Sequence, residues 1–460
     1  MSKTYRPYDP DQMFLMPPSV KDWLPVGHLA HFIADIVENL DVSTITDVYE
    51  REERGFPPYH PVMMVRVLLY AYCIGLPSSR RIERALVEDV ALRYLAANNT
   101  PDFRTIADFR KRHLEALRGL FLQVLRLCQK AGMVKLGHVA LDGTKMKANA
   151  SKHKAMSYAR MNKEEPRLQA EVDELLRRAD EIDEAEDAEY GRDKRGDELP
   201  AELAYREGRL KKIREAKEAL EREAREEAEA RKREADAKRA EKDPRGRRPG
   251  EPDPTPRDKA QKNFTDPDSR IMPQPGDRLS FMQGYNCQAA VDAEAQIIVA
   301  ADVAQHTNDS RQAKPMLEQV KANVGRVPRK ASMDAGYFSE DNVRALKKLG
   351  VELFVPPERQ KHGLSTPAAP RGRMPKELST KDRMRRKLQT LRGRAVYAKR
   401  KTIVEPVFGQ TKQGRGFRQF LLRGLVKVKG EWSLICTTHN LLKLWRKMSG
   451  GCKRLALQAA

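Results

Sequence analysis

Cysteine is scarce in this sequence: five are spread over 460 residues, with no CxxC pair and no grouping with histidine at zinc-ligand spacing. Neither a disulfide framework nor structural zinc is therefore indicated, and we expect the cysteines to be small apolar core residues. Long apolar runs are lacking too, because the best candidate, residues 62–74, contains Arg66 and falls short of the ~20 residues that span a bilayer. The first residues, MSKTYRPYDPDQ, lack the apolar stretch of a secretory signal. These absences predict a cytoplasmic protein without a membrane segment.

Positive charge is in excess, with 87 Lys and Arg against 65 Asp and Glu and a formal net charge of +22. Such a balance favours an anionic partner, with nucleic acid the first candidate and an acidic membrane surface the second. The excess is concentrated in residues 371–430, where 19 basic residues face three acids, a net of +16. The basic surface is therefore expected to be local.

Residues 1–135 are predicted to be helical. Apolar residues at helical spacing indicate a core helix over 105–132, opened by Thr105 and Asp108 at capping-box spacing. A second helix is predicted over 80–96, and a turn separates the two. The pair predicts a helical hairpin; a DNA-binding helix-turn-helix and a plain packed helical domain both agree with it.

The pattern changes at residues 138–142, a short apolar run that ends in Asp142 and is followed by glycine, which predicts a strand with a carboxylate at its end. Residues 160–242 are rich in Glu, Arg, Lys and Ala, which is typical of a solvated helix or antiparallel coiled coil. We expect breaks in that stretch at Gly191, Gly196 and Pro200. Residues 243–277 are predicted to form a Pro-rich linker without regular structure.

Strand and helix signals alternate after the linker. A hairpin is predicted from strands 285–291 and 296–303, then a helix capped by residues 308–310, a strand over 330–333 that ends at Asp334, a helix over 341–349 and a strand over 351–355. This order of elements is that of an RNase H-like α/β domain, interrupted after its first strand by the helical insertion. An all-α N-terminal domain precedes it.

In that topology the first and fourth strands are neighbours at the centre of the sheet. Asp142 and Asp334 would then meet although they are 192 positions apart (334 minus 142), and Glu405 on a following helix could reach the same place. Carboxylates this close raise each other's pKa unless cations lie between them, and hard oxygen ligands suit Mg²⁺. Two ions about 4 Å apart would support an in-line phosphoryl transfer. Taken alone, an aspartate at a strand end before glycine is most often a turn residue, and Glu405 alone would be a glutamate on the surface of a helix.

Several motifs resemble those of bacterial insertion-sequence transposases, which combine a helical N-terminal domain with a DDE catalytic domain. The resemblance covers nearly the whole chain outside the charged insertion. In the N-terminal half it rests on HPV at 60–62, LYAY at 69–72, SSRRIE at 78–83 and PDFRTIADFR at 101–110. In the second part it rests on LDGTK at 141–145, TDPDSR at 265–270, GYN at 284–286 and MDAGY at 333–337.

A further motif resembles the family's Tyr-Arg-Glu-Lys signature, with Tyr397, Glu405 and Lys412 in matching positions. Arg400 has the family's spacing from the tyrosine and Lys401 has its spacing to the glutamate, so either could be the phosphate-binding residue. Pro406 follows the acid directly, which predicts that Glu405 lies at a helix start or at a kink.

The loop at 414–418 mixes glycine, arginine and phenylalanine, as a segment that follows a phosphate backbone does. Arg415 and Arg418 are accordingly predicted DNA contacts, with a simple basic turn as the alternative.

The resemblance implies a DDE transposase that cleaves and joins DNA. Asp142, Asp334 and Glu405 would be both catalytic residues and ligands of two Mg²⁺ ions, with Mn²⁺ able to substitute. One partner would be double-stranded DNA, both as the terminal inverted repeats and as the target. The other would be a second copy of the chain, in a homodimer on DNA. No membrane partner is expected. We expect the protein in the cytoplasm, at the nucleoid.

The expected domains are a helical, DNA-binding domain at 1–135, an RNase H-like catalytic domain at 136–155 and 263–448, and a charged helical insertion with its linker at 156–262. The alternatives are an RNase H-like nuclease without strand transfer and a non-catalytic DNA-binding protein.

Overall fold

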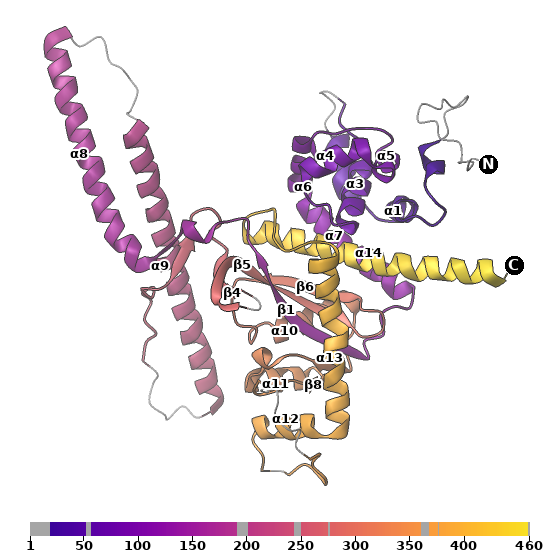
Figure 1. Ribbon diagram of the computed structural model, residues 1–460. Coiled ribbons are helices and arrows are strands. Elements are labelled where there is room, and N and C mark those ends of the chain that lie inside the picture. The colour runs from indigo at the N-terminus through magenta and orange to yellow at the C-terminus, as the bar shows by residue number, and fades with distance from the viewer. Residues whose placement is uncertain are drawn as a thin grey trace, which may run out of the picture.

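The computed structural model describes residues 19–51, 57–190, 201–242, 250–274, 277–359, 368–375 and 377–458. Its N-terminal part is helical, as predicted, and packs into one bundle (Figure 1). The elements are η1 (Val20–Trp23), α1 (Leu29–Glu38), α2 (Ser43–Glu50), α3 (Pro61–Cys73), α4 (Ser79–Glu88), α5 (Val90–Leu95), α6 (Phe103–Arg112) and α7 (Leu114–Lys130).

Both helices predicted in this region are split, which corrects the expected bounds. The one predicted over 80–96 is divided at Asp89, whose carboxylate accepts a hydrogen bond from the Leu92 N–H at 2.9 Å and starts α5. The one predicted over 105–132 is divided at His113. The capping-box prediction was wrong, because α6 is capped by Asp102, which accepts from the Thr105 N–H at 2.7 Å.

A mixed sheet forms the centre of the second part. Its members are β1 (His138–Lys147), β4 (Arg270–Gln274), β5 (Asp277–Asp292), β6 (Ile298–Ala304), β7 (Lys330–Ser332) and β8 (Glu352–Phe354). The order is β4-β5-β1-β7-β8, with β6 also paired to β5. β1 runs antiparallel to β5 and parallel to β7, and β7 runs parallel to β8. The predicted adjacency of the first and fourth strands of the RNase H-like order is confirmed.

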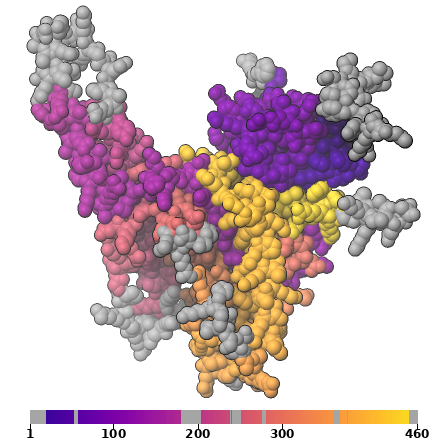
Figure 2. Space-filling model, in the orientation of Figure 1, coloured from indigo at the N-terminus to yellow at the C-terminus, as the bar shows by residue number. Residues whose placement is uncertain are grey.

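Helices flank and follow the sheet: α10 (Ala313–Val324), η3 (Ala335–Tyr337), α11 (Glu340–Lys348), α12 (Thr380–Gln389), α13 (Leu391–Gly409), the π-helical turn η4 (Gln410–Gly414) and α14 (Leu425–Gln458). α14 packs against α3 and α7 on one side and β6 on the other, and lies between the N-terminal helices and the sheet (Figures 1 and 2). The Trp432 indole N–H donates to the Gln288 carbonyl at 3.1 Å. The Asn440 side chain bonds both backbone groups of Ile298 at 2.9 Å. Sheet and N-terminal bundle thus share one continuous core.

The insertion is an arm that leaves the sheet after β1 (Figure 1). After η2 (Lys152–Lys154) and β2 (Ala155–Ser157) it consists of α8 (Tyr158–Tyr190) and α9 (Ala201–Lys242), which pack on each other as the composition predicted. The predicted breaks Gly191, Gly196 and Pro200 lie outside the described residues. The arm has its own small core of Met156, Met161, Leu168, Val172, Leu203, Leu210, Ile213, Ala216 and Leu220.

The prediction of a structureless linker over 243–277 was wrong for its second half. β3 (Gln261–Asn263) pairs antiparallel with β2, and β4 pairs with β5. The pairing partner of β3 lies about a hundred residues earlier in the chain, so local composition carried no sign of it.

The cysteines at 73, 128, 287 and 436 are buried, as predicted, while Cys452 lies outside the residues whose side chains are described. Among the described helices, each is too short or too polar to cross a membrane.

Candidate active site

Asp142 lies where two central strands diverge. β1 pairs with β7 only through Ala140, and then continues to Lys147 with β5 as its partner. The expectation that Asp142 ends its strand was therefore wrong, but the parallel neighbour does end there. Beyond Ala140 one edge of β1 is free of β7, and Asp142 is the second residue past that point. Its side chain is 18% exposed.

Asp334 follows the end of β7, as predicted, and its carboxylate caps η3 by accepting a hydrogen bond from the Gly336 N–H at 2.8 Å. A side chain at Gly336 would crowd this carboxylate, because a Cβ there would lie 3.1 Å from Asp334 Oδ1. The charge of Asp334 acts on Asp142: burial first, and Asp334 in addition, raise the pKa of Asp142 to about 6, against the opposing attraction of Arg400. The two acids are therefore electrostatically coupled.

Arg400, on α13, is the cation of the site. Its Nη1 donates to Asp142 Oδ2 at 2.8 Å, and its Nη2 lies 3.9 Å from Glu405 Oε1. The Arg400 side chain is 12% exposed and Glu405 is 54% exposed. Although burial opposes its charge, Asp142 raises the pKa of Arg400 above its ordinary value. Of the two basic residues that could fill the signature's arginine position, Arg400 faces the acids, whereas Lys401 is exposed.

Glu405 lies inside α13, so of the two predicted positions, a helix start and a kink, the helix start was wrong. Pro406 has no N–H to donate to the carbonyl four residues earlier, that of Thr402. That carbonyl accepts instead from Gln296 Nε2 at 2.9 Å, in the connection between β5 and β6. Because a donor from the sheet satisfies the orphaned carbonyl, α13 continues through the proline and holds Glu405 near Arg400.

A fourth acid, Asp309, adjoins the site and was missed. It was expected to help cap a helix, but α10 begins later, after Gln312 without a side-chain cap. Asp309 Oδ1 instead accepts from Asn286 Nδ2 and Gln288 Nε2, both at 2.7 Å. Burial raises the pKa of Asp309, and the charge of Asp334 adds to the effect. Two amides at alternate positions of one apolar strand were the available signal, because they face one side and need a buried partner.

Gly143 fits between these groups. A Cβ at this position would come within 2.6 Å of Gln288 Nε2 and 2.9 Å of Asp309 Oδ1. The glycine after Asp142 therefore permits β1 to lie close to the amides of the neighbouring strand β5 and to the carboxylate of Asp309, which follows β6.

The remaining predicted contacts separate into two groups. Lys412 is half-buried and its Nζ donates to the Lys145 carbonyl on β1 at 2.7 Å, and Tyr397 lies under Arg400 with its ring centroid 5.9 Å away. Burial lowers the pKa of Lys412 and raises that of Tyr397. Arg418 is exposed.

Arg415, by contrast, is 8% exposed. Its guanidinium donates to Thr438 Oγ1 at 2.8 Å and also to the Ile435 carbonyl. The guanidinium fastens the loop to α14 and does not face solvent.

The donor chemistry of the site suits a divalent cation. Within the described ranges no three acidic, histidine or cysteine side chains lie together as a ready metal site. Arg400 instead stands in as the positive charge between Asp142 and Glu405, and its Nε is buried without a hydrogen-bond partner in the described part of the chain. A carboxylate whose pKa is raised by a second acid is stabilised by any cation that enters beside it.

Two family models match the chain. One, described as Transposase DDE domain, matches residues 254–441, which include Asp309, Asp334 and Glu405. The other, described as Transposase domain (DUF772), matches residues 18–112. Asp142 lies outside both ranges. No curated protein and no solved structure matched the chain.

Proposed function

Because this chain belongs to the DDE transposases of insertion sequences, we propose that it binds the ends of its element and catalyses metal-dependent DNA cleavage and strand transfer. The catalytic residues in this proposal are Asp142, Asp334 and Glu405. One observation carries it: Arg400 bridges Asp142 on β1 and Glu405 on α13, while the charge of Asp334 acts on the same buried carboxylate.

Asp142, Asp334 and Glu405 would hold two Mg²⁺ ions, with Mn²⁺ able to substitute. Cations bound there lower the pKa of an attacking water or 3′-hydroxyl and stabilise the departing oxyanion of an in-line phosphoryl transfer. Because the Glu405 side chain is exposed, it is free to turn toward Asp142 and Asp334. When Arg400 releases Asp142, the carboxylate oxygen that the guanidinium covered becomes available to a cation.

Arg400 has two partners in this mechanism. In the absence of DNA it neutralises Asp142, and with DNA bound its guanidinium moves to a phosphate beside the reacting bond. Lys412, whose Nζ is bonded to the Lys145 carbonyl on β1, would contact the same DNA strand. Together with Tyr397, Lys401 and Arg418 these residues form the proposed DNA contact of the catalytic domain. Arg415 is left out because its guanidinium is used inside the protein.

Strand transfer of both element ends requires two active sites, so we propose a homodimer on DNA. The proposed division of labour follows the chain: residues 1–135 bind DNA, 136–155 with 263–448 catalyse, and 156–262 form the insertion. The substrate is double-stranded DNA carrying the terminal inverted repeats, and the target is a second duplex, which sets the place of action at the nucleoid.

The test uses purified protein, Mg²⁺ and labelled duplexes that carry the element's ends. The proposal expects both cut ends and joined products, and loss of both in Asp142→Ala. Cutting without joining would favour a nuclease. Absence of both products, or activity retained by Asp142→Ala, would sink the proposal.

A further inference from the structure

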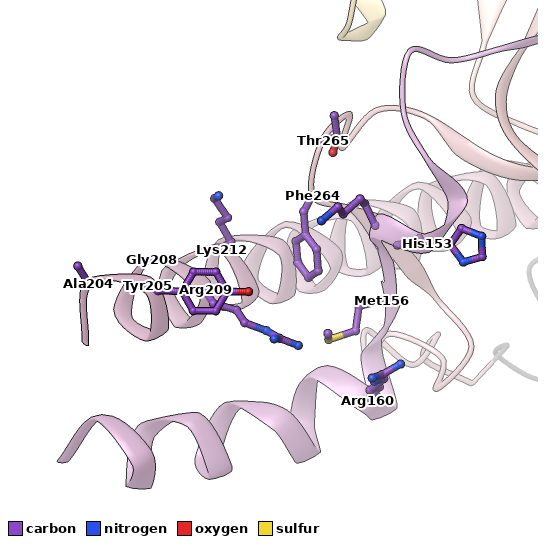
Figure 3. A pocket seen from close by; sticks show the side chains of 12 residues that line it. His153, Met156, Arg160, Ala204, Tyr205, Gly208, Arg209, Lys212, Phe264 and Thr265 are labelled. Atoms are coloured by element: carbon purple, nitrogen blue, oxygen red, sulfur yellow. The ribbon is translucent and has the colours of Figure 1, made fainter. Parts of the chain in front are cut away.

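A cavity lies at the root of the arm, away from the acids. It has a volume of about 570 Å³ and is enclosed by the first turns of α8, the N-terminal part of α9 and the short strand β2 (Figure 3). Four cations line it: Lys154, Arg160, Arg209 and Lys212. No acidic side chain is among its described lining residues, so the cavity is strongly positive.

Many basic side chains of the arm are paired with acids: Glu165 binds Arg214 and Lys217 at 3.2 and 2.9 Å, and Glu171 binds Arg206 at 3.0 Å. None of the four cavity cations makes an ion pair or a side-chain hydrogen bond within the described ranges. What sets the four cations apart is that they are gathered around one hollow without an acid among them, and such a cluster is available to an anion outside the chain.

Aromatic rings accompany the cations. Tyr205 on α9 is 67% exposed, and Phe264 lies on the opposite wall, above the buried Met156 (Figure 3). Phe264 is half-buried against the core of the arm, so Tyr205 is the ring that is accessible. An exposed ring beside unpaired cations suits a nucleotide, because the ring stacks on a base while the cations hold its phosphates. A free inorganic anion has no base on which an aromatic ring could stack.

The root of the arm is fixed to the sheet. Glu223 of α9 pairs with Arg270 of β4 at 3.0 Å and also with Lys262 of β3. Asn263 Nδ2 donates to the Ser151 carbonyl at 2.8 Å, in the segment that continues β1. A ligand held in the cavity would therefore have a constant position relative to the strand that carries Asp142.

We propose that this cavity is a second DNA site, which grips the phosphate backbone and stacks an unpaired base of the DNA on which the chain acts. The inference rests on the proposed function only in taking DNA as the partner. A single-stranded flap or gap next to a duplex fits it best, since a base within a duplex is already stacked on its neighbours.

The experiment measures binding of the full chain by fluorescence anisotropy, in EDTA so that nothing is cut. The probes are a blunt duplex and the same duplex with a single-stranded flap. The cavity variant Arg209→Gln/Lys212→Gln is compared with Lys211→Gln/Arg222→Gln, which removes the same charges from exposed, unpaired positions of α9 outside the cavity.

We expect the cavity variant to bind the flap DNA at least 10-fold more weakly, with the slope of log K against log salt reduced by about 1.4–1.8. The control pair should lose less than about 3-fold. Tyr205→Ala should weaken flap binding by roughly 10-fold and leave blunt duplex binding unchanged, while Tyr205→Phe, which keeps the ring, should bind as the unmodified chain does.

Equal losses in the two double variants would overturn the site, because they would show a general charge effect. A change in sedimentation of the cavity variant without loss of DNA affinity would overturn it in favour of a protein contact. Failure of the unmodified chain to cut or join DNA, with these binding losses still present, would remove the proposed function and leave the second DNA site standing.

Discussion

Asp142→Asn is predicted to stabilise the metal-free protein while abolishing its activity. The pKa of Asp142 is raised from 3.8 to about 6 in the folded protein. Above pH 6 the folded state therefore contains a carboxylate that is more costly to ionise than in the unfolded chain. A difference of 2.2 pKa units (6 minus 3.8) corresponds to about 3 kcal/mol. The attraction of Arg400 is already contained in that value.

The sign follows from proton uptake. Between pH 4 and pH 6 the folded state binds one proton more than the unfolded state at this position, so the stability at this site falls as pH rises through that window and stays low above it. Asn carries no charge at any pH. The advantage of Asp142→Asn should therefore be about 3 kcal/mol at pH 8 and close to zero below pH 4.

Urea unfolding in EDTA at pH 8 and at pH 4 measures this difference. A thermal melt at pH 8 should show a matching increase in Tm on the order of 5 °C. Asp35→Asn is the control, because this acid on α1 is exposed and far from the site in the chain. An Asp142→Asn protein that is no more stable than the unmodified protein at pH 8 would refute the reasoning, since the burial and the neighbouring charge would then not disfavour the ionised carboxylate.

The same geometry predicts the outcome for four further variants. Arg400→Gln should raise the affinity for Mn²⁺ without DNA by roughly 10-fold, because the charge-assisted hydrogen bond of Arg400 no longer competes with the metal for the Asp142 carboxylate. Electron paramagnetic resonance titration measures this affinity, and an unchanged value would contradict the proposal that Arg400 takes the place of a metal ion. Glu405→Gln should leave the Tm unchanged, because the side chain is 54% exposed, yet lose joined product in the strand-transfer assay. Arg415→Ala should lower the free energy of unfolding by about 3 kcal/mol, whereas Arg418→Ala should keep the Tm and reduce the salt slope of DNA binding by about 1. If Arg415→Ala instead reduced the salt slope of DNA binding and Arg418→Ala lowered the free energy of unfolding, Arg415 would be the residue that faces DNA.

The central part of the topology could be predicted from the sequence. Short apolar runs with a defined order were enough to place β1 beside β7 and so bring together Asp142 and Asp334, because RNase H-like connections leave few alternatives. Those runs also located the β5–β6 hairpin, whereas the charged, Ala-rich composition of residues 160–242 located the two helices of the arm. Their bounds were less accurate, since pairing partners decide where a strand such as β1 ends.

Tertiary contacts decided what the sequence could not. Asn308-Asp309-Ser310 is locally a helix start, but the amides of Asn286 and Gln288 on a distant strand take the carboxylate of Asp309.

Arg415 lies in a segment that resembles a phosphate-binding loop, yet α14 covers it. Pro406 predicted a helix start or a kink at Glu405, and one side-chain amide from Gln296 allows α13 to continue through the proline. In each case the deciding group lies far away in the sequence.

The most direct test of a metal-dependent reaction at these acids is the strand-transfer assay with Asp334→Cys, run in Mg²⁺ and in Mn²⁺. Sulfur is a poor ligand for Mg²⁺ and a better one for softer cations. If Asp334 holds a catalytic metal, joined product should be absent with Mg²⁺ and return with Mn²⁺, while Asp334→Ala stays inactive with both. Equal activity of Asp334→Cys with the two ions, or product formed by Asp334→Ala, would contradict the account.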